Sequence, residues 1–196
     1  MNLFLIILLV IVVGIGLWLM STYNFFAQAK VRINAAVQEI GNQLKRQADL
    51  IPNLEASAKG YLTHEKEVYK MLTDARKAVA GAVGSGNLQK MSDAGAQLNA
   101  VLPKLSIAVE SNPELKANTL VQNLMDELRD TADKIMYSRR LLIDLTADFN
   151  SRRVTFPTNI IANMMNVQEM KGLITPTDGE FLNVSDADTQ TPKVSL

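Results

Sequence analysis

The stretch LFLIILLVIVVGIGLWLM, residues 3–20, decides how the rest of the chain is organised. It is an uninterrupted apolar run, and no charged side chain precedes Lys30. At about 1.5 Å per residue, a helix of this length spans roughly the 30 Å hydrocarbon core of a bilayer. We therefore predict a transmembrane signal anchor over residues 1–22.

Two other interpretations of this run fit less well. Ala27-Gln28-Ala29 has the small-x-small form of a signal-peptidase site, but no Lys or Arg precedes the run. The run also exceeds the usual signal-peptide core of about 7–15 residues. A buried core helix would need apolar partners on every side, whereas the downstream sequence offers only amphipathic segments. An uncleaved anchor fits better than either.

The positive charges beside the run predict its orientation. None precedes it, whereas Lys30 and Arg32 follow it closely. The positive-inside rule then places the N-terminus outside and the C-terminal domain in the cytoplasm. Trp18 and Tyr23 fit the aromatic belt at the inner interface, so we expect these four residues to be the membrane-interface anchors.

The composition excludes several classes of partner and chemistry. Twenty basic residues balance twenty acidic ones, so we expect no nucleic-acid partner. The absence of cysteine excludes disulfides, thiol catalysis, lipoprotein acylation and Cys-based zinc sites.

After the apolar run, a persistent stripe of apolar residues at steps of three and four predicts helices with coiled-coil-like packing. Gln47 and Glu65 are its polar positions, and its phase is kept across Pro52. We therefore predict one long helix, kinked at Pro52 and ending near Ala82, with two separate helices as the alternative. The stripe comprises Ile33, Val37, Ile40, Leu44, Ile51, Leu54, Ala58, Tyr61, Val68, Leu72, Ala75 and Val79.

The rest of the chain divides into two further long helices and a short one. Gly81, Gly84 and Gly86 predict a turn, and Asn87 a helix N-cap. The buried face of the second helix is predicted to run from Leu88 to Val109, with a local kink at Pro103. The third helix is predicted to begin near Pro113 or Asn118, to carry Leu120 on its buried face, and to end at Phe156-Pro157. A short helix with Ile160, Ile161, Met164 and Met165 is predicted to follow, capped by Thr158 or Asn159.

These elements predict an all-α fold. The N-terminal transmembrane helix runs into an antiparallel up-and-down bundle of three long helices plus a short fourth, over residues 23–171. From residue 172 to 196 the chain is polar and acidic without a period, which predicts a disordered tail.

No motif of catalysis stands out. His64 is the sole histidine, and a hydrolytic zinc helix would need a second one where Val68 stands. The chain has no nucleophile elbow, phosphate-binding loop or dinucleotide fingerprint. We expect neither enzymatic activity nor a cofactor or metal.

Glu65 is the one charged residue on the apolar stripe. A buried carboxylate is costly unless a cation meets it. We predict a partner among Lys45, Arg46, Arg139 and Arg140, either as an ion pair that sets the register of the bundle or as a site that recognises a ligand or protein partner.

Several blocks of the sequence resemble the LemA family of bacterial membrane-anchored proteins. The longest is QLKRQADLIPNLEASAKGYLTHEKEVYKMLTDARKA, residues 43–78. The others are Tyr23-Asn24, residues 112–118, 124–128 and 135–139, Asp148-Phe149-Asn150 and residues 156–159. The resemblance implies a bacterial or phage-carried single-pass protein of the inner membrane with a cytoplasmic helical bundle, commonly described as four-helix. The activity of that family is poorly defined, although some relatives are associated with intracellular membrane compartments.

Three functional hypotheses follow. The first is a scaffold anchored in the lipid bilayer that self-associates to organise or remodel the membrane. The second is an adaptor that recruits a cytoplasmic or signalling protein, and the third is a hydrolase or ligand sensor with a pocket around Glu65. Gly14-Ile15-Gly16 lacks the four-residue spacing of a membrane dimer motif, so any homo-oligomer should form through the soluble helices.

Overall fold

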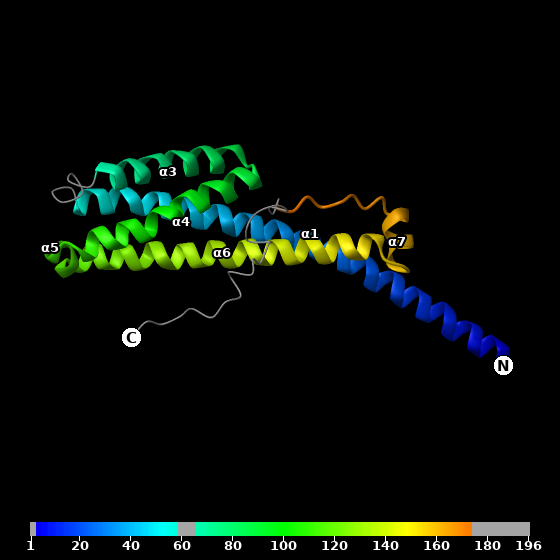
Figure 1. The fold of residues 1–196 in the computed structure, drawn as a ribbon. Helices are drawn as coiled ribbons and strands as arrows, with labels where there is room; N and C mark the ends of the chain where they lie inside the picture. The colour runs from blue at the N-terminus through cyan, green and yellow to red at the C-terminus, as the bar shows by residue number, and fades with distance from the viewer. Residues whose placement is uncertain (1–2, 59–65, 174–196) are drawn as a thin grey trace, which may run out of the picture.

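The computed structural model describes residues 3–58 and 66–173, and in these ranges every regular element is a helix. The predicted all-α fold with an N-terminal apolar helix is confirmed. The helices are α1 (Leu3–Ser57), α3 (Lys66–Ser85), α4 (Leu88–Glu110), α5 (Pro113–Ala117), α6 (Thr119–Val154) and α7 (Thr158–Met164) (Figure 1).

Helix α1 runs without interruption from the apolar stretch through Pro52 to Ser57. Proline removes one backbone hydrogen bond from a helix interior. Ile51 and Leu54 beside it are fully buried, and their burial offsets that loss. The chain therefore does not break at Pro52.

The predicted single helix from the membrane to Ala82 is wrong. α1 ends at Ser57, and α3 lies back alongside it (Figure 1). The three-and-four spacing of Val68, Leu72 and Ala75 identifies a buried face. The same spacing fits a helix that folds back on α1 and a helix that continues it. The described part of the chain thus contains four long helices, α1, α3, α4 and α6, where three were predicted.

Successive long helices alternate in direction (Figure 1). Between α1 and α6, the Phe26 ring contacts the Phe149 ring, and Gln47 bonds to Leu128. Residue numbers rise on one helix as they fall on the other, so α1 and α6 run antiparallel.

The molecule has two unlike halves along its length. Far from the N-terminus, α3 and α4 pack on α1 and α6; we call this the four-helix half (Figure 1). Nearer the N-terminus, of the long helices only α1 and α6 continue side by side, with α7 and residues 165–173 beside them; we call this the two-helix half (Figure 1).

The predicted buried stripe is confirmed on all four long helices. Its described positions on α1 and α3 are buried, except that Val37 is half-buried. Leu120, which the pattern placed on the buried face of α6, is exposed, because the buried face begins one residue later at Val121.

The helix ends differ in part from expectation. Gly81 and Gly84 lie inside α3, and Gly86 alone, with φ +62°, makes the turn. Two exposed helical glycines cost about 1 kcal/mol each, which the packing of Val79 and Ala82 on the same helix offsets. Asn87 caps α4 as predicted, accepting a bond from the Lys90 N–H (3.0 Å).

Two further helix starts were predicted with alternatives. Asn118 caps α6 and Asn112 caps the separate short helix α5, so both predicted starts exist. At α7 the N-cap is Pro157, without a side-chain bond, and neither Thr158 nor Asn159 takes that place. The Thr158 hydroxyl instead donates to the Thr155 carbonyl (2.9 Å).

Candidate functional site

The apolar stretch of α1 projects from the bundle as a bare stem (Figure 1). It is long and apolar enough to cross a membrane, and none of its most apolar window is buried within the chain. Trp18 is half-buried, and Thr22 is the first buried residue of α1, with 6% of its surface exposed. Bundle packing therefore starts directly where the apolar stretch ends.

The four predicted interface anchors lie on both sides of this junction. Trp18, Tyr23, Lys30 and Arg32 lie along about 21 Å of α1. Tyr23, Lys30 and Arg32 are exposed, so their side chains are free to meet lipid headgroups or solvent.

An aromatic cluster holds α6 to α1 just beyond the stem. Phe26 and Phe149 are both buried and meet edge to face, with ring centroids 5.3 Å apart. Phe25 meets Phe26 in the same manner at 5.4 Å, and the Arg152 guanidinium lies 3.9 Å from the Phe25 ring centroid. Edge-to-face rings and a cation over a ring face add to the hydrophobic burial of the cluster.

Residues 165–173, which we call the strap, return along α6. The Asn150 side chain donates to the Met170 carbonyl (2.8 Å) and accepts from the Met170 N–H (3.0 Å). Arg153 Nε donates to the Val167 carbonyl (3.1 Å). Sequence reasoning quoted Asn150 within a motif but gave it no role, because nothing local indicates a backbone partner this far along the chain.

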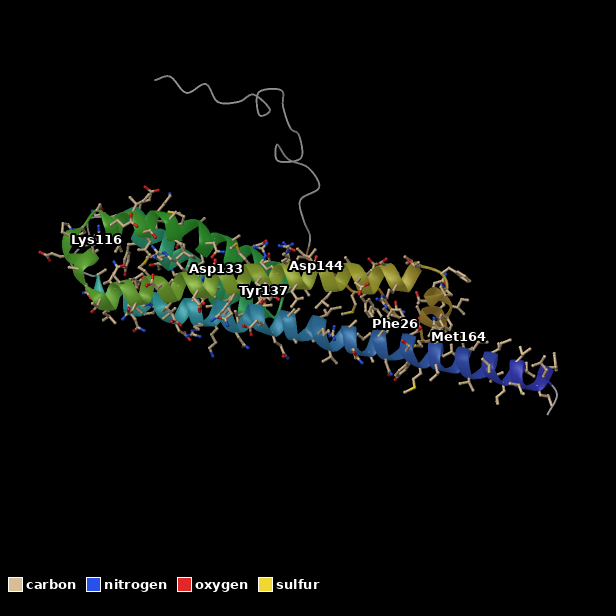
Figure 2. All side chains as sticks on the ribbon, turned by 90° about the horizontal axis from the view of Figure 1, so that it is seen from below. Phe26, Lys116, Asp133, Tyr137, Asp144 and Met164 are labelled. Atoms are coloured by element: carbon tan, nitrogen blue, oxygen red, sulfur yellow. The ribbon has the colours of Figure 1, made fainter. Side chains whose placement is uncertain are left out.

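An open groove of about 760 Å³ lies between α1 and α6. Tyr137 is 69% exposed on it (Figure 2). Both signs of charge line it, with Arg32 and Lys134 against Glu39 and Asp133. Its lining also includes Ala35, Ala36, Ser138, Leu141 and Leu145. No sequence pattern marked this groove, because it forms between α1 and α6, two helices that are far apart in the sequence.

The predicted ion pair of Glu65 lies outside the described residues and stays a prediction. Of its proposed partners, Arg46 forms a salt bridge with Glu127 on α6. Lys45 and Arg140 are exposed and Arg139 is half-buried, and none of the three has an ion pair within residues 3–58 and 66–173.

Gln47 is the polar side chain that the described part of the stripe buries. It is fully buried, and its Nε2 donates to the Leu128 carbonyl (3.2 Å). Its Oε1 has no hydrogen-bond partner among the residues that the structure describes. Such a one-sided amide bond fixes how α1 sits against α6 at a cost in desolvation.

The described residues offer no evident metal centre. Among them, no three His, Cys, Asp or Glu side chains lie together as ligands for an ion. His64 lies outside the described ranges, as does all of the predicted tail beyond Leu173.

A comparison with known families now adds to this geometry. The model of the LemA family matches residues 36–195. The chain belongs to the LemA family. The resemblance found in the sequence is thereby confirmed, and the matched region begins within α1 beyond the stem and covers every later helix of the LemA bundle. No curated protein matches the chain.

Proposed function

We propose that this LemA protein is a non-enzymatic scaffold, anchored in the bacterial inner membrane by one span and self-associating through its soluble helices. Its N-terminus lies outside, and its up-and-down, coiled-coil-like bundle lies in the cytoplasm. The observation that carries the proposal is the continuity of α1, which forms both the bare apolar stem and one side of the bundle.

This continuity makes the bundle a fixed extension of the span. A flexible linker would let a domain sample many orientations. Here Met20 and Thr22 belong to one helix, so the bundle has a set direction relative to the stem. A fixed distance and direction from the membrane supports the scaffold proposal.

The groove supports association between copies. Neighbouring copies in one bilayer stand parallel, so groups at the same height meet. From the Phe26–Phe149 pairing, Arg32 stands within about 2 Å of the height of Asp144, and Glu39 within about 3 Å of that of Lys134. Two copies related by a two-fold axis along the membrane normal can place α1 of each copy against α6 of the other. In that arrangement these opposite charges pair.

Disulfide trapping tests this contact in the full chain. Because the protein has no cysteine, Tyr137→Cys introduces a single thiol in the groove, and Ile107→Cys a matched one on an exposed site of α4. In detergent micelles and in lipid nanodiscs, oxidation should give covalent dimers of the first variant and not the second. Monomers of both variants, together with a monomeric native chain at all concentrations, would contradict self-association.

Topology is checked separately with membranes of the native host. Protease added to spheroplasts should leave the bundle intact, whereas protease added to inverted inner-membrane vesicles should digest it. The reverse result would place the bundle outside.

The adaptor remains the second candidate, because Arg139 and Arg140 have no ion pair within the described residues. The double reversal Arg139→Glu, Arg140→Glu should leave trapped dimers unchanged if the groove contact is the functional one. Loss of a single stoichiometric cross-linked protein upon reversal, with dimers intact, would favour the adaptor.

A further inference from the structure

We propose that the corner between α6 and α7 lies in the headgroup region of the same bilayer that the stem crosses, as a second, non-spanning membrane attachment. The corner comprises the exposed apolar residues Val154, Phe156, Ile160, Met164 and Met165. The inference rests on the proposed membrane anchor.

The register of the helices sets the height of this corner. Phe149 meets Phe26, so five residues further along α6 Val154 comes about level with Ser21. Arg152 lines a hollow together with Leu17, Met20 and Ser21, which confirms that height. Beyond Val154, α7 packs on both α1 and α6, and Met164 lies beside α1 at the base of the stem (Figure 2). The corner is thus level with the end of the apolar stretch.

The exposure of the corner is unusual for a surface facing water. Phe156 is 75% exposed and Met164 79% exposed, and Ile160 presents about half of its surface. The other side of α7 buries Ile161 and Ala162 against the bundle. A surface helix of a soluble domain is polar on its outer side, whereas α7 presents apolar side chains on both. A clustered exposed apolar surface beside a membrane span marks a membrane contact.

The charges around the corner complement an anionic leaflet. No acidic residue precedes Glu39, and none lies between Arg152 and Gln168. Asp148, the acidic side chain one turn away on α6, accepts a bond from Arg152 Nε (3.2 Å). On this end of α1 and α6, the four basic residues Lys30, Arg32, Arg152 and Arg153 outnumber Asp144 and Asp148, which leaves a net positive charge that anionic lipid attracts.

Spin labels on single cysteines test the depth of the corner in the full chain. Phe156→Cys and Met164→Cys are labelled in vesicles of phosphatidylethanolamine and phosphatidylglycerol, and collisions with oxygen are compared with collisions with a water-soluble nickel complex. Ile107→Cys and Leu120→Cys are matched controls, being exposed apolar positions in the four-helix half. The oxygen-to-nickel ratio should be several-fold higher at both corner positions than at both controls.

A stem position separates failure of this inference from failure of the anchor. Val10→Cys should report the bilayer interior. If it does while the corner matches the controls, the corner inference is overturned and the anchor stands. If Val10→Cys reports water, the proposed anchor itself fails.

A second measurement guards against distortion by the label. The ratio at Ile160→Cys should fall to the control value when Phe156→Ser and Met164→Ser are added, with the helical circular dichroism unchanged. An unchanged ratio with intact helicity would show that the corner does not hold itself in the interface.

Discussion

The four-helix half and the two-helix half hold α1 and α6 together by different means. In the four-helix half, aliphatic side chains from four helices enclose one another, and Leu44, Leu98 and Leu128 are fully buried. In the two-helix half no third long helix is present, and Phe26, Phe149 and the strap take its place. Two helices cannot enclose a core, so large rings and side-chain bonds to backbone replace the missing helices.

The largest effect is expected from Phe149→Ala, which removes the central ring of the two-helix half. Loss of a fully buried phenylalanine costs about 3–5 kcal/mol of unfolding free energy. Urea unfolding of the full chain in detergent measures the loss. Phe156→Ala, at a residue that is 75% exposed, should change stability by no more than about 0.5 kcal/mol. Equal effects would mean that the ring pair does not hold this half.

Next in size is Asn150→Ala, which should free the strap. Its two bonds to Met170 are lost and leave that backbone without partners, a cost of about 1–3 kcal/mol. Hydrogen exchange of the Met170 amide should accelerate while amides of α3 and α4 keep their rates. Asn163→Ala, at an exposed position on α7, is the control and should leave Met170 unchanged.

A pair of glycine replacements compares close packing with its absence. A Cβ at Gly95 of α4 would come within 3.2 Å of Leu44 Cδ2 and 3.6 Å of Ile135 Cγ2, whereas one at Gly81 of α3 would meet nothing within 4 Å. Gly81→Ala should raise the free energy of unfolding by up to about 1 kcal/mol through helix propensity. The free energy of unfolding of Gly95→Ala should be about 1–2 kcal/mol lower than that of Gly81→Ala. Equal gains would show that the four-helix half packs loosely at Gly95.

The smallest effect is expected from Gln47→Met in the four-helix half. The change removes a buried oxygen without a partner and keeps the volume, so the free energy of unfolding should rise by about 1 kcal/mol. Gln47→Glu should lower it by placing a charge at the same buried point. The denaturant midpoints of both variants and of the native chain measure these changes. A lower midpoint for Gln47→Met would mean that the hydrogen bond to Leu128 stabilises the fold by more than the unpaired oxygen costs.

Buried faces could be predicted from the sequence, but chain reversals and long-range partners could not. Apolar spacing identified Ile40, Leu72 and Leu142 because burial alone dictates it. The same spacing continues from α1 into α3, so it carried no signal that the chain turns back between Ser57 and Lys66.

The candidate site was the less predictable part. The predicted interface anchors could be named because their charge and aromatic pattern is local to one helix. The groove depends on how α1 pairs with α6, and the strap depends on an asparagine that bonds to a backbone twenty residues later. Neither the groove nor the strap produces a periodic pattern in the sequence. The stripe signalled polar residues at Gln47 and Glu65, and only the first lies in the described part of the chain.

The unbroken course of α1 also makes the protein a lever. Its 55 residues measure about 80 Å, of which about 54 Å lie beyond Thr22. A thinner bilayer makes a span lean over, and a lean of about 10° swings the tip at Ser57 sideways by about 9 Å. With the proposed anchor, changes in membrane thickness would thereby be amplified into displacement of the tip of α1 at Ser57, with no break in the helix to absorb them.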